Sequence, residues 1–529
     1  MTADAGGDRA LSIDDLFHAL PIDGKELRLP PDTPADAGRS VLGVRHDSRL
    51  VEAGDAFVVR RGKAHDGANY VQEAVERGAV MLIIEPDALP HVSNTNLPLM
   101  IVPDAALALA YAADAVYEHP TFSMEVVGIT GTNGKTTTTH LLRSVIDGAL
   151  GSGTCGVIGT IGHQIGAERI ESSYTTPEAD ELARVMKTMR DRGAQFVAME
   201  VSSIAIELSR VAAIRFRVAA FTNLTQDHLD FHGTMESYAK AKAKLFYELG
   251  PATACINIDD PFGRELAANV PCPVLRSSSK ANADAEFFPR EASFAREGLS
   301  GIVATPVGDV PFRSRLVGPH NLENVLLCLS IAHALDIDLV RAAASIAAAP
   351  GVPGRLERCD TPGDDIVVLV DYAHTPDALA RVLSAVRFDG SSRVLCVFGC
   401  GGDRDAKKRG PMGAAAGAGA DIAILTNDNP RTEDPMDIAR PVVAELDRLG
   451  LPSLVRADLR TKDRGYFVEL DRERAIEDAI AEARAGDLVL VAGKGHEDYQ
   501  ITGVTKKYFD DREVSRAALA RRRASGLRN

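Results

Sequence analysis

The sequence predicts an α/β protein with several domains, each built around a largely parallel sheet. Its 529 residues are too many for one hydrophobic core, because domains usually hold about 100 to 200 residues. Strand-like apolar runs alternate with helix-like apolar spacing over residues 123-352 and again over residues 353-529, and this alternation is typical of doubly wound sheets. A smaller α/β unit precedes them. We therefore place three domains at residues 1-122, 123-352 and 353-529.

Composition and charge restrict the functional classes. Hydrophobic residues make up 45% and charged residues 25% of the chain, and no apolar run approaches the roughly 18 residues of a membrane span. The N-terminus lacks a basic, apolar signal, so we expect a cytoplasmic protein without membrane insertion. As a separate expectation, we take the protein to be a monomer. The net charge of −15 argues against nucleic acid as a partner but allows small anionic molecules, which local amides, cations and Mg²⁺ can bind.

The seven cysteines are scattered singly, mostly within or beside apolar runs, and they lack metal-ligand spacing. Reduced thiols in the core are the expected state. Cys400 lies in a glycine-rich loop and is expected to be partly exposed, without a catalytic role.

The N-terminal domain has the pattern of a small α/β unit. Strands are expected at residues 56-59, 80-84 and 100-102, and helices at residues 13-20, 71-78 and 105-117. Ser48 and the loop at residues 63-67 are its only convergent polar groups. By pattern alone these groups are more typical of turns than of a binding site.

The central domain opens with a candidate phosphate-binding loop. An apolar strand at residues 125-130 ends in a glycine-rich segment, and helical apolar spacing follows. The segment consists of Gly131, Thr132, Asn133, Gly134, Lys135, Thr136 and Thr137. In such a loop the lysine meets the outer phosphates of a nucleotide and the next hydroxyl ligates Mg²⁺. Ile129 stands where the usual first glycine would be, so an ordinary strand-to-helix turn is the alternative.

Two polar side chains follow the next strands of this domain. Glu200 follows a strand at residues 196-199, and His228 lies in the polar segment after a strand at residues 218-221. A carboxylate, an imidazole and the Thr136 hydroxyl are hard ligands suited to Mg²⁺ between protein and phosphates. Taken singly, Glu200 is more typical of a helix start or a surface, and His228 of a hydrogen-bonded core position. Their joint placement favours the metal site.

Two further segments of the central domain, one before and one after an expected strand at residues 254-258, are ambiguous. Lys240, Lys242 and Lys244 lie two apart on a predicted helix, and the pattern alone favours a solvated basic face. A long apolar helix begins near Asn321, whose amide suits either helix capping or a contact to adenine.

The C-terminal domain repeats the order of strand, polar loop and helix. Its strands are expected at residues 366-370, 394-398, 422-426 and 488-492. The loops after them carry two arginines, several carboxylates and Lys494. Such a set suits a zwitterionic amino acid, because arginine pairs with a carboxylate bidentately and a carboxylate pairs with an ammonium group.

These motifs resemble those of the Mur ligase family of bacterial cell-wall synthesis over nearly the whole chain. The matching motifs lie at residues 131-137, 200-203, 227-228, 320-324, 354-355 and 371-374. Within the family, the sequence is most similar to members that add the third amino acid of the peptide. Residues 428-431, Asp-Asn-Pro-Arg, resemble the signature of members that accept meso-2,6-diaminopimelate, whereas lysine-adding members lack the arginine.

The resemblance implies a role for each set of residues. ATP would contact residues 131-137, Asn321, Arg355 and Asp371. Two Mg²⁺ ions would be held by Thr136, Glu200, His228 and Lys242, the last carrying a carbamate derived from CO₂. The catalytic residues would be Lys135, Lys242, His228 and Glu200. The UDP-N-acetylmuramoyl-dipeptide would contact Ser48, Lys63, Ala64, His65, Thr175, Thr176, Ser202 and Arg210. Diaminopimelate would contact Arg404, Asp428, Asn429, Pro430, Arg431, Gly493 and Glu497.

Three positions depart from the family pattern. Tyr174 stands where asparagine is frequent, Ile204 where histidine is frequent, and Leu208 where glutamine is frequent. The last two put apolar groups near the dipeptide, so we expect the peptide to be held differently.

The resemblance further implies a small UDP-sugar-binding N-terminal domain, a central P-loop domain that binds ATP, and a Rossmann-like C-terminal domain that binds the amino acid. The implied reaction joins diaminopimelate to UDP-N-acetylmuramoyl-L-alanyl-D-glutamate, with ATP converted to ADP through an acyl phosphate, in peptidoglycan precursor synthesis. The alternatives are a sister ligase that adds lysine or another amino acid, or glutamate to folate, and a non-catalytic P-loop nucleotide switch. Arg431 and the UDP-sugar motif count against the sister ligases, and the C-terminal loops count against the switch.

Overall fold

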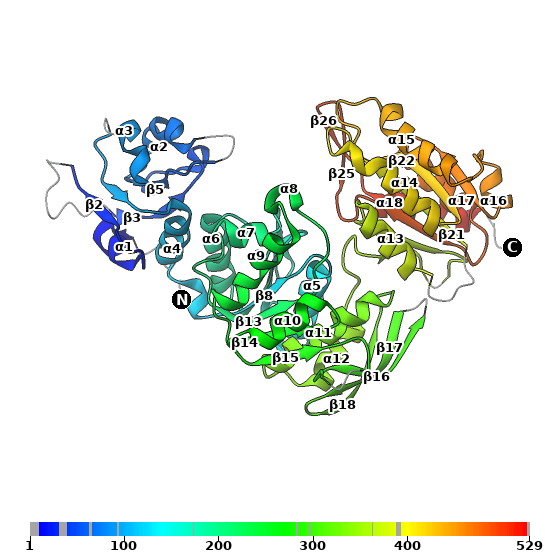
Figure 1. Cartoon of the computed structure of the whole chain (residues 1–529), viewed down its shortest axis with the longest axis horizontal. Coiled ribbons are helices and arrows are strands. Elements are labelled where there is room, and N and C mark those ends of the chain that lie inside the picture. Colours follow the sequence, from blue (N-terminus) through cyan, green and yellow to red (C-terminus); the bar gives the residue numbers. More distant parts are fainter. Residues whose placement is uncertain are drawn as a thin grey trace, which may run out of the picture. The chain divides into compact units, whose positions relative to one another are not determined.

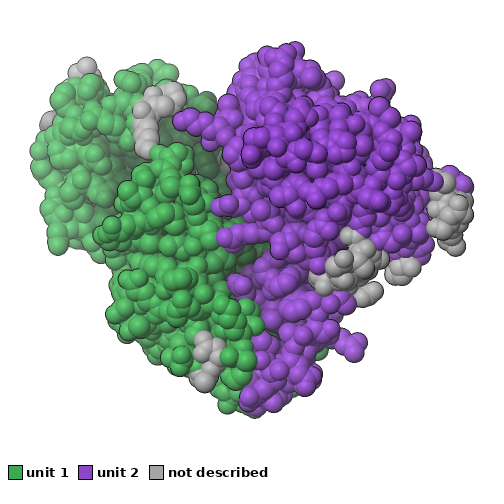
Figure 2. All heavy atoms as spheres, turned by 45° about the vertical axis from the view of Figure 1, so that its right-hand side comes forward, with its two compact units in different colours: residues 1–288, 305–307, 326–345 green, residues 289–304, 308–325, 346–529 purple. Residues whose placement is uncertain are grey.

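The computed structural model of the protein describes residues 10-30, 40-62, 66-92, 95-172, 174-281, 284-295, 298-361, 363-387 and 393-525. The chain forms two compact units (Figure 2). Unit 1 comprises Met1–Phe288, Thr305–Val307 and Leu326–Ser345, and unit 2 comprises Pro289–Ala304, Gly308–Val325 and Ile346–Asn529. In the described part of the chain, none of the helices combines the length and the apolar character that a bilayer span requires.

The first sheet of unit 1 has five strands in the order β2-β7-β6-β5-β4. Its members are β2 (Glu26–Arg28), β4 (Gly43–Arg45), β5 (Asp55–Val58), β6 (Met81–Ile84) and β7 (Leu99–Ile101). Only β2 runs antiparallel to its neighbour, and β5 and β6 are buried throughout, as expected of strands covered on both faces. The associated elements are β1 (Leu11–Ser12), α1 (Ile13–Ala19), β3 (Ser40–Val41), η1 (Ser48–Leu50), η2 (Gly67–Tyr70), α2 (Val71–Glu76), η3 (Pro86–Ala88), α3 (Leu89–Val92), α4 (Ala105–Val116) and η4 (Pro120–Phe122).

The second sheet of unit 1 has eight strands in the order β11-β10-β9-β12-β8-β13-β14-β15, and all pairs from β9 to β15 are parallel. Its members are β8 (Glu125–Thr130), β9 (Cys155–Gly159), β10 (Gly162–Ile165), β11 (Glu168–Ile170), β12 (Phe196–Glu200), β13 (Phe216–Phe221), β14 (Thr253–Asn257) and β15 (Val274–Ser277). Because β12 and β13 flank β8, the carboxyl ends of these three strands meet at one edge.

The helices of this sheet are α5 (Lys135–Leu150), α6 (Ala179–Asp191), α7 (Ser203–Glu207), α8 (Leu229–His232), α9 (Met235–Tyr247) and α10 (Pro261–Asn269). Apolar residues of α6, α9 and α10 share one core with alternate residues of β8, β12, β13 and β14. Then follow the three-stranded sheet β16 (Phe288–Ala295), β17 (Gly298–Thr305) and β18 (Gly308–Ser314), and the helices α11 (His320–Ala334) and α12 (Leu339–Ala348).

Unit 2 contains a six-stranded sheet in the order β19-β20-β24-β21-β22-β23, parallel except for β19. Its members are β19 (Glu357–Arg358), β20 (Val367–Asp371), β21 (Val394–Cys400), β22 (Ile422–Asn427), β23 (Gly465–Val468) and β24 (Leu488–Ala492). The hairpin β25 (Tyr499–Thr502) with β26 (Thr505–Tyr508) follows it.

Helices cover both faces of this sheet (Figure 1). α13 (Pro376–Ala385), α14 (Arg409–Gly419) and α15 (Pro435–Arg448) share a core with one set of alternate strand residues, and α17 (Arg472–Glu482) and α18 (Asp511–Ala524) share a core with the other set. η5 (Ala406–Lys408) and α16 (Asp458–Thr461) complete the unit. The doubly wound sheet predicted from the sequence is therefore confirmed.

The long apolar strands and helices predicted from the sequence are present, with ends that shift by one or two residues. β9 to β11, β16 to β18 and the β25-β26 hairpin were not foreseen. Glycines interrupt β9 and β17, and β11 and β26 are largely exposed, so these segments lack a clear apolar pattern. The domain boundaries after residues 122 and 352 stay predictions.

Candidate functional site

The phosphate-binding loop connects β8 to α5, and its glycines meet both conformational and steric demands. Gly131 has a φ of 144° and Gly134, the N-cap of α5, has a φ of 87°. A Cβ atom at Gly131 would lie 1.9 Å from Thr222 Oγ1. Ile129 is a fully buried residue of β8, so the position that usually holds the first glycine belongs here to the sheet core.

The segment after β13 holds this loop in place. Thr222 Oγ1 donates to Asn133 O at 2.6 Å, and Asn133 N donates to Asn223 Oδ1 at 3.0 Å. Thr132 Oγ1 donates to Thr225 O at 3.0 Å. The sequence indicated no role for Asn223, because a short polar side chain after a strand is equally typical of any loop.

Lys135 is the first residue of α5, and its side chain turns back over the loop. Its Nζ donates to Gly131 O at 2.8 Å and to Thr132 O at 2.9 Å. Phosphate oxygens are stronger acceptors than these neutral carbonyl groups. The placement therefore suits the predicted contact to the outer phosphates.

Glu200 ends β12 next to the loop, and it is only 1% exposed. Thr136 Oγ1 donates to its Oε2 at 3.0 Å. Thr160 donates its backbone N–H to Oε1 at 2.8 Å and its hydroxyl to Oε2 at 3.1 Å. A Cβ atom at Gly159 would lie 2.3 Å from Oε1, so only glycine leaves room for the carboxylate. Glu200 is therefore neither a surface residue nor a helix cap.

The pair formed by Thr136 and Glu200 fits a Mg²⁺ ion. Both supply oxygen atoms, and Mg²⁺ usually combines one or two carboxylates with substrate phosphates and water. Within the described ranges no group of three or more His, Cys, Asp and Glu side chains is arranged to hold a metal. The donor set thus suits an ion that is shared with a nucleotide, rather than a cage of protein ligands.

His228 lies at the edge of the loop and is not a core residue. Its backbone is left-handed, with a φ of 51°, and its side chain is 44% exposed. The ring lies edge-on to Tyr238, with centroids 6.2 Å apart, and the Tyr238 hydroxyl lies 3.2 Å from Thr132 Oγ1. The accessible imidazole therefore contacts Tyr238, whose hydroxyl lies beside Thr132 of the phosphate-binding loop.

Lys242 projects from α9 and is 1% exposed. Its Nζ donates to Gly131 O at 2.9 Å and lies 4.5 Å from the centroid of the Tyr238 ring. Burial, and then the positive charge of Lys135, hold the pKa of Lys242 well below its ordinary value, although Asp227 opposes this. Burial and the neighbouring Lys135 thus favour the neutral form of this amine.

The solvated basic face predicted for this helix is wrong for Lys242. Lys240 is exposed and pairs with Glu236 at 2.6 Å, and Lys244 pairs with Glu207 at 3.0 Å. Helical spacing places the middle lysine on the opposite face, where the sheet and the loop cover it.

Four of the residues predicted to contact the UDP-N-acetylmuramoyl-dipeptide lie together beside Glu200. Thr176 Oγ1 donates to Glu200 O at 2.9 Å and accepts from Ser202 N at 3.1 Å. Arg210 Nη1 donates to Thr176 O at 2.9 Å. Thr175 Oγ1 lies 3.0 Å from the hydroxyl of Thr160, which itself binds Glu200. A hydrogen-bonded chain therefore connects the phosphate-binding loop to this cluster through a threonine that the sequence did not single out.

Tyr174, one of the departures, contacts this cluster through its ring. The Arg210 guanidinium stacks 4.9 Å from the ring centroid and forms an ion pair with Glu178. Ile204 lies within α7 and Leu208 is its C-cap residue, and both are partly buried. The tyrosine thus orients a cation that an asparagine could only hydrogen-bond.

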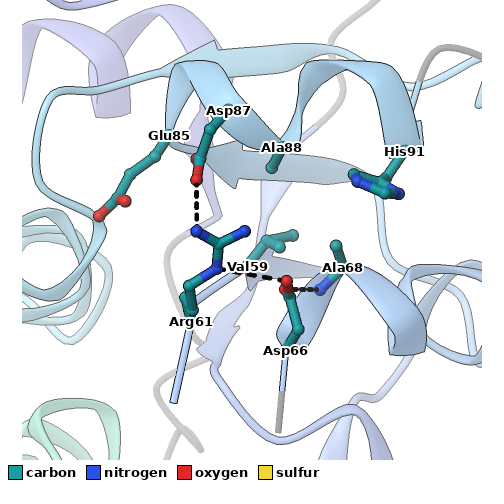
Figure 3. A pocket seen from close by; sticks show the side chains of 8 residues that line it. All are labelled: Val59, Arg61, Asp66, Ala68, Glu85, Asp87, Ala88 and His91. Carbon is teal, nitrogen blue, oxygen red and sulfur yellow. Dashed lines mark hydrogen bonds and ion pairs between the residues drawn. The ribbon is translucent and has the colours of Figure 1, made fainter. Parts of the chain in front are cut away.

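In the first sheet, Ser48 is buried and its Oγ donates to Glu73 Oε2 at 2.7 Å. Lys63, Ala64 and His65 lie outside the described residues. Arg61 and Asp66 flank them in sequence, and Figure 3 shows Arg61 directed at Asp66 and at Asp87, with N–O distances of 3.4 and 3.1 Å. The hollow that these residues line adjoins the carboxyl ends of β5 and β6 (Figure 3), and its lining residues are Val59, Arg61, Asp66, Ala68, Glu85, Asp87, Ala88 and His91.

The other predicted ATP contacts lie in unit 2. Asp371 Oδ2 accepts from Leu356 N at 2.7 Å, and the Arg355 guanidinium lies 4.7 Å from the Tyr372 ring centroid. Burial raises the pKa of Asp371, and Arg355 opposes this. Asn321 Nδ2 donates to a carbonyl in the preceding turn at 2.7 Å, which satisfies that amide locally.

The loops after β21 and β22 of unit 2 hydrogen-bond to each other at the predicted amino-acid site. Gly402 N donates to Asn429 O at 2.9 Å, and Arg431 Nη1 donates to Gly402 O at 2.8 Å. A Cβ atom at Gly402 would lie 2.0 Å from Pro430 O. Arg431 has a φ of 51°, and its backbone pairs with Thr502 of β25. Arg404 is exposed on the first of these loops.

The loop after β24 completes this site. Gly493 has a φ of 122°, a conformation that favours glycine. Glu497 Oε1 accepts from the Tyr372 hydroxyl at 3.5 Å, and Lys494 Nζ lies 3.1 Å from Asp428 Oδ1. Burial and the charge of Asp428 raise the pKa of Glu497, whereas Lys494 lowers it. The site thus joins two carboxylates, two arginines and a buried lysine.

The prediction that Cys400 is partly exposed is wrong. Cys400 is the last residue of β21 and is only 3% exposed. Burial raises the pKa of its thiol to about 11. All seven cysteines are unpaired thiols, as expected from their spacing.

Three family profiles match the chain. The "Mur ligase family, catalytic domain" profile covers residues 40-117, the "Mur ligase middle domain" profile covers residues 129-332, and the "Mur ligase, glutamate ligase domain" profile covers residues 354-495.

Curated relatives resemble the chain over nearly its whole length. The UDP-N-acetylmuramoyl-L-alanyl-D-glutamate–2,6-diaminopimelate ligase of Gloeobacter violaceus is 44% identical, over 97% of this chain and 99% of that protein. The ligases of the same name from Geobacter metallireducens and Streptomyces coelicolor are 44% and 40% identical, each over 92% of this chain, and over 96% and 93% of their own lengths.

Solved structures share the fold. A UDP-N-acetylmuramoyl-L-alanyl-D-glutamate–2,6-diaminopimelate ligase superposes with a TM-score of 0.69 at 30% identity, over 97% of this chain and 99% of that chain. The UDP-N-acetylmuramoylalanyl-D-glutamyl-2,6-diaminopimelate–D-alanyl-D-alanyl ligase of Acinetobacter baumannii superposes with a TM-score of 0.61 over 98% and 100% of the two chains. Its identity of 16% shows likeness of fold alone.

Proposed function

The chain belongs to the Mur ligase family, and from this premise we propose that it is an ATP-dependent, ADP-forming ligase that adds meso-2,6-diaminopimelate to UDP-N-acetylmuramoyl-L-alanyl-D-glutamate. One observation carries the proposal: 44% identity to a ligase of that name over 97% of this chain and 99% of the relative. The product would be a peptidoglycan precursor. Because ATP and a UDP-linked precursor are its proposed substrates, we place the reaction in the cytoplasm. The monomeric state stays a prediction.

We further propose that each predicted domain binds one substrate. Residues 1-122 would bind the UDP-sugar, residues 123-352 would bind ATP, and residues 353-529 would bind the amino acid. Ser48 follows β4, the phosphate-binding loop follows β8, and Arg431 lies in the loop after β22. These three strands belong to three separate sheets, which supports this division.

The phosphate-binding loop would prepare phosphoryl transfer to the substrate carboxylate. Lys135 would exchange its carbonyl partners for phosphate oxygens, and the amides at the start of α5 would bind the same anion. Thr136, Glu200 and His228 would hold Mg²⁺, which when bound supplies positive charge near the phosphates. Burial of Glu200 keeps its oxygen atoms fixed, so little reorganisation is needed when the nucleotide binds.

Lys242 would carry a carbamate that helps to hold a second Mg²⁺. CO₂ adds only to a neutral amine, and burial together with Lys135 keeps the pKa of Lys242 well below its ordinary value. The resulting anion would also lie near the positive charge of Lys135, which would stabilise it. The lowered pKa of Lys242 supports the assignment of the carbamate to this residue.

The amino-acid site would orient diaminopimelate as the amine that attacks the acyl phosphate. Arg404 and Arg431 would pair with a substrate carboxylate, and Glu497 would pair with its second ammonium group, with Asp428 beside it. Such a site rejects lysine because lysine lacks the second carboxylate, which would leave Arg431 without its partner.

An amino-acid panel in a ligation assay tests this function. Wild type should release phosphate with UDP-N-acetylmuramoyl-L-alanyl-D-glutamate and diaminopimelate, and lysine should support much slower release. Arg431→Ala should raise the KM for diaminopimelate about 10- to 100-fold, since a charged hydrogen bond is lost. Arg440→Ala is the matched control, because Arg440 is exposed on α15 and pairs only with a surface carboxylate.

The same panel separates the alternatives. Faster ligation of lysine than of diaminopimelate would favour a sister ligase and contradict the role of Arg431. Absence of phosphate release with every amino acid, despite nucleotide binding, would favour a nucleotide switch and refute the ligase.

A further inference from the structure

Lys494 occupies the centre of the amino-acid site, although no motif discussed above gives it a role. It follows Gly493 at the end of β24, and its side chain is fully buried. Its Nζ lies 3.1 Å from Asp428 Oδ1, and it donates to Asn429 Oδ1 at 3.1 Å and to Tyr499 O at 2.8 Å. Two hydrogen bonds and one ion-pair contact therefore place three oxygen atoms around the ammonium group.

These three acceptors lie on two segments that are distant in sequence from each other. Asp428 and Asn429 belong to the loop after β22, whereas Tyr499 begins the β25-β26 hairpin. The hairpin contacts the same loop directly, because Ile501 N donates to Asn429 Oδ1 at 2.9 Å and Gln500 Nε2 donates to Asp428 O at 2.9 Å. Lys494 therefore joins the loop, the hairpin and its own strand end at one point.

A second buried cation beneath the site is already neutralised. Arg472 is fully buried and pairs with Asp511 at 2.6 Å, and it also donates to Asn427 O and Ala492 O at the ends of β22 and β24. The carboxylate of Asp511 satisfies Arg472, so Asp428 is left to pair with Lys494. Of these two ion pairs, only the one between Lys494 and Asp428 includes a residue of the loop after β22 that is predicted to contact the amino acid.

We propose that Lys494 is a positioning residue for the amino-acid substrate. Its ammonium fixes the orientation of Asp428 and Asn429, and it balances one of the two site carboxylates, which leaves the charge of Glu497 for the substrate ammonium group. This role rests on the proposed function of the site.

The titration behaviour of the groups agrees with this geometry. Burial acts to raise the pKa of Asp428, but Lys494 and Arg472 outweigh it and hold that pKa below its ordinary value. Burial lowers the pKa of Lys494, and Asp428 opposes this. Asp428 is therefore the ionised partner of the lysine, whereas burial raises the pKa of Glu497.

Steady-state kinetics of Lys494→Met and Lys494→Gln test the proposal. Met keeps the length of the side chain without its charge, and Gln keeps N–H donors without the charge. Both should raise the KM for diaminopimelate about 10- to 100-fold, since Asp428 loses its cation, while the KM for ATP should stay within about 2-fold of wild type. Lys462→Met, at an exposed lysine of the same unit, should leave both values unchanged.

A double variant separates positioning from mere stability. If Lys494 acts through Asp428, Lys494→Met combined with Asp428→Asn should raise the KM for diaminopimelate no further than Asp428→Asn alone. An equal rise in the KM values for ATP and diaminopimelate would mean a general loss of structure and would overturn the proposal. So would an unchanged KM for diaminopimelate in either single variant. Failure of wild type to ligate diaminopimelate would refute the proposed function itself, and with it this role.

Discussion

Two lysines in the described part of the chain are fully buried, one in each unit, and their surroundings differ. Lys242 of unit 1 contacts a backbone carbonyl and an aromatic ring, whereas Lys494 of unit 2 lies 3.1 Å from a carboxylate. Burial lowers the pKa of both. Lys135 adds to this effect at Lys242, while Asp428 counteracts it at Lys494.

The difference shows that burial alone does not define the chemistry of a lysine. Where no carboxylate forms an ion pair with it, burial shifts a lysine toward the neutral, nucleophilic amine. With one, it remains a cation that fixes its partner in place. We therefore expect substitutions at Lys242 to change the rate of the reaction and substitutions around Lys494 to change the affinity for the amino acid.

Lys242→Ala should have the largest effect. If a carbamate forms on the neutral amine, its loss should lower kcat by about 100-fold or more, the range seen when one preorganised electrostatic contact is removed. A small added carboxylate should restore part of the activity, because it can occupy the vacated position. Phosphate release measures both.

Lys240→Ala is the matched control, since Lys240 is an exposed lysine on the same helix, and it should behave as wild type. Full activity of Lys242→Ala without any added carboxylate would break the contrast between the two lysines.

Gly402→Ala should have an intermediate effect, directed at the amino-acid site. The added Cβ would lie 2.0 Å from Pro430 O, so the loops after β21 and β22 must move apart. We expect the KM for diaminopimelate to rise about 10-fold and the protein to be destabilised by about 1 to 3 kcal/mol.

Gly410→Ala provides the comparison, because its Cβ would meet no atom closer than 3.9 Å and Gly410 lies within α14. It should be neutral or slightly stabilising, since alanine favours helix. Thermal unfolding and steady-state kinetics of Gly402→Ala and Gly410→Ala test this expectation. An equal effect of both substitutions would contradict the steric argument.

His163→Phe should have the smallest effect on activity and should appear only in stability. His163 of β10 is fully buried, neither ring nitrogen has a hydrogen-bond partner among the described residues, and burial lowers its pKa from 6.5 to about 4. Between these values the unfolded chain binds more protons than the folded one. Wild type should therefore lose stability as the pH falls below 6.5, by about 1.4 kcal/mol per pH unit until about pH 4.

Phenylalanine removes this proton uptake, so His163→Phe should lose less stability than wild type between pH 7 and pH 5 in denaturant unfolding. His18→Gln, at an exposed histidine of α1, should keep the pH dependence of wild type. Identical pH dependence of wild type and His163→Phe would show that His163 does not titrate in this way.

The sequence by itself determined the fold class, the long strands and the loops that carry the chemistry. Apolar runs such as β8 and β24 are buried on both faces, and such runs are recognisable without structure. The phosphate-binding loop was equally readable, because its glycines, lysine and threonine are contiguous and their roles follow from local backbone geometry. The same holds for the Asp-Asn-Pro-Arg segment at residues 428-431.

Only the tertiary structure decided which of the scattered polar residues act together. Thr160 lies 40 residues from Glu200 in sequence yet donates two hydrogen bonds to it, and Lys494 lies 65 residues from Asn429. Such partners give no local signal, since their pairing depends on the order of the strands and on what covers each side chain. The same physics separates Lys242 from Lys240: two lysines on one helix differ because one faces the sheet and the other faces water.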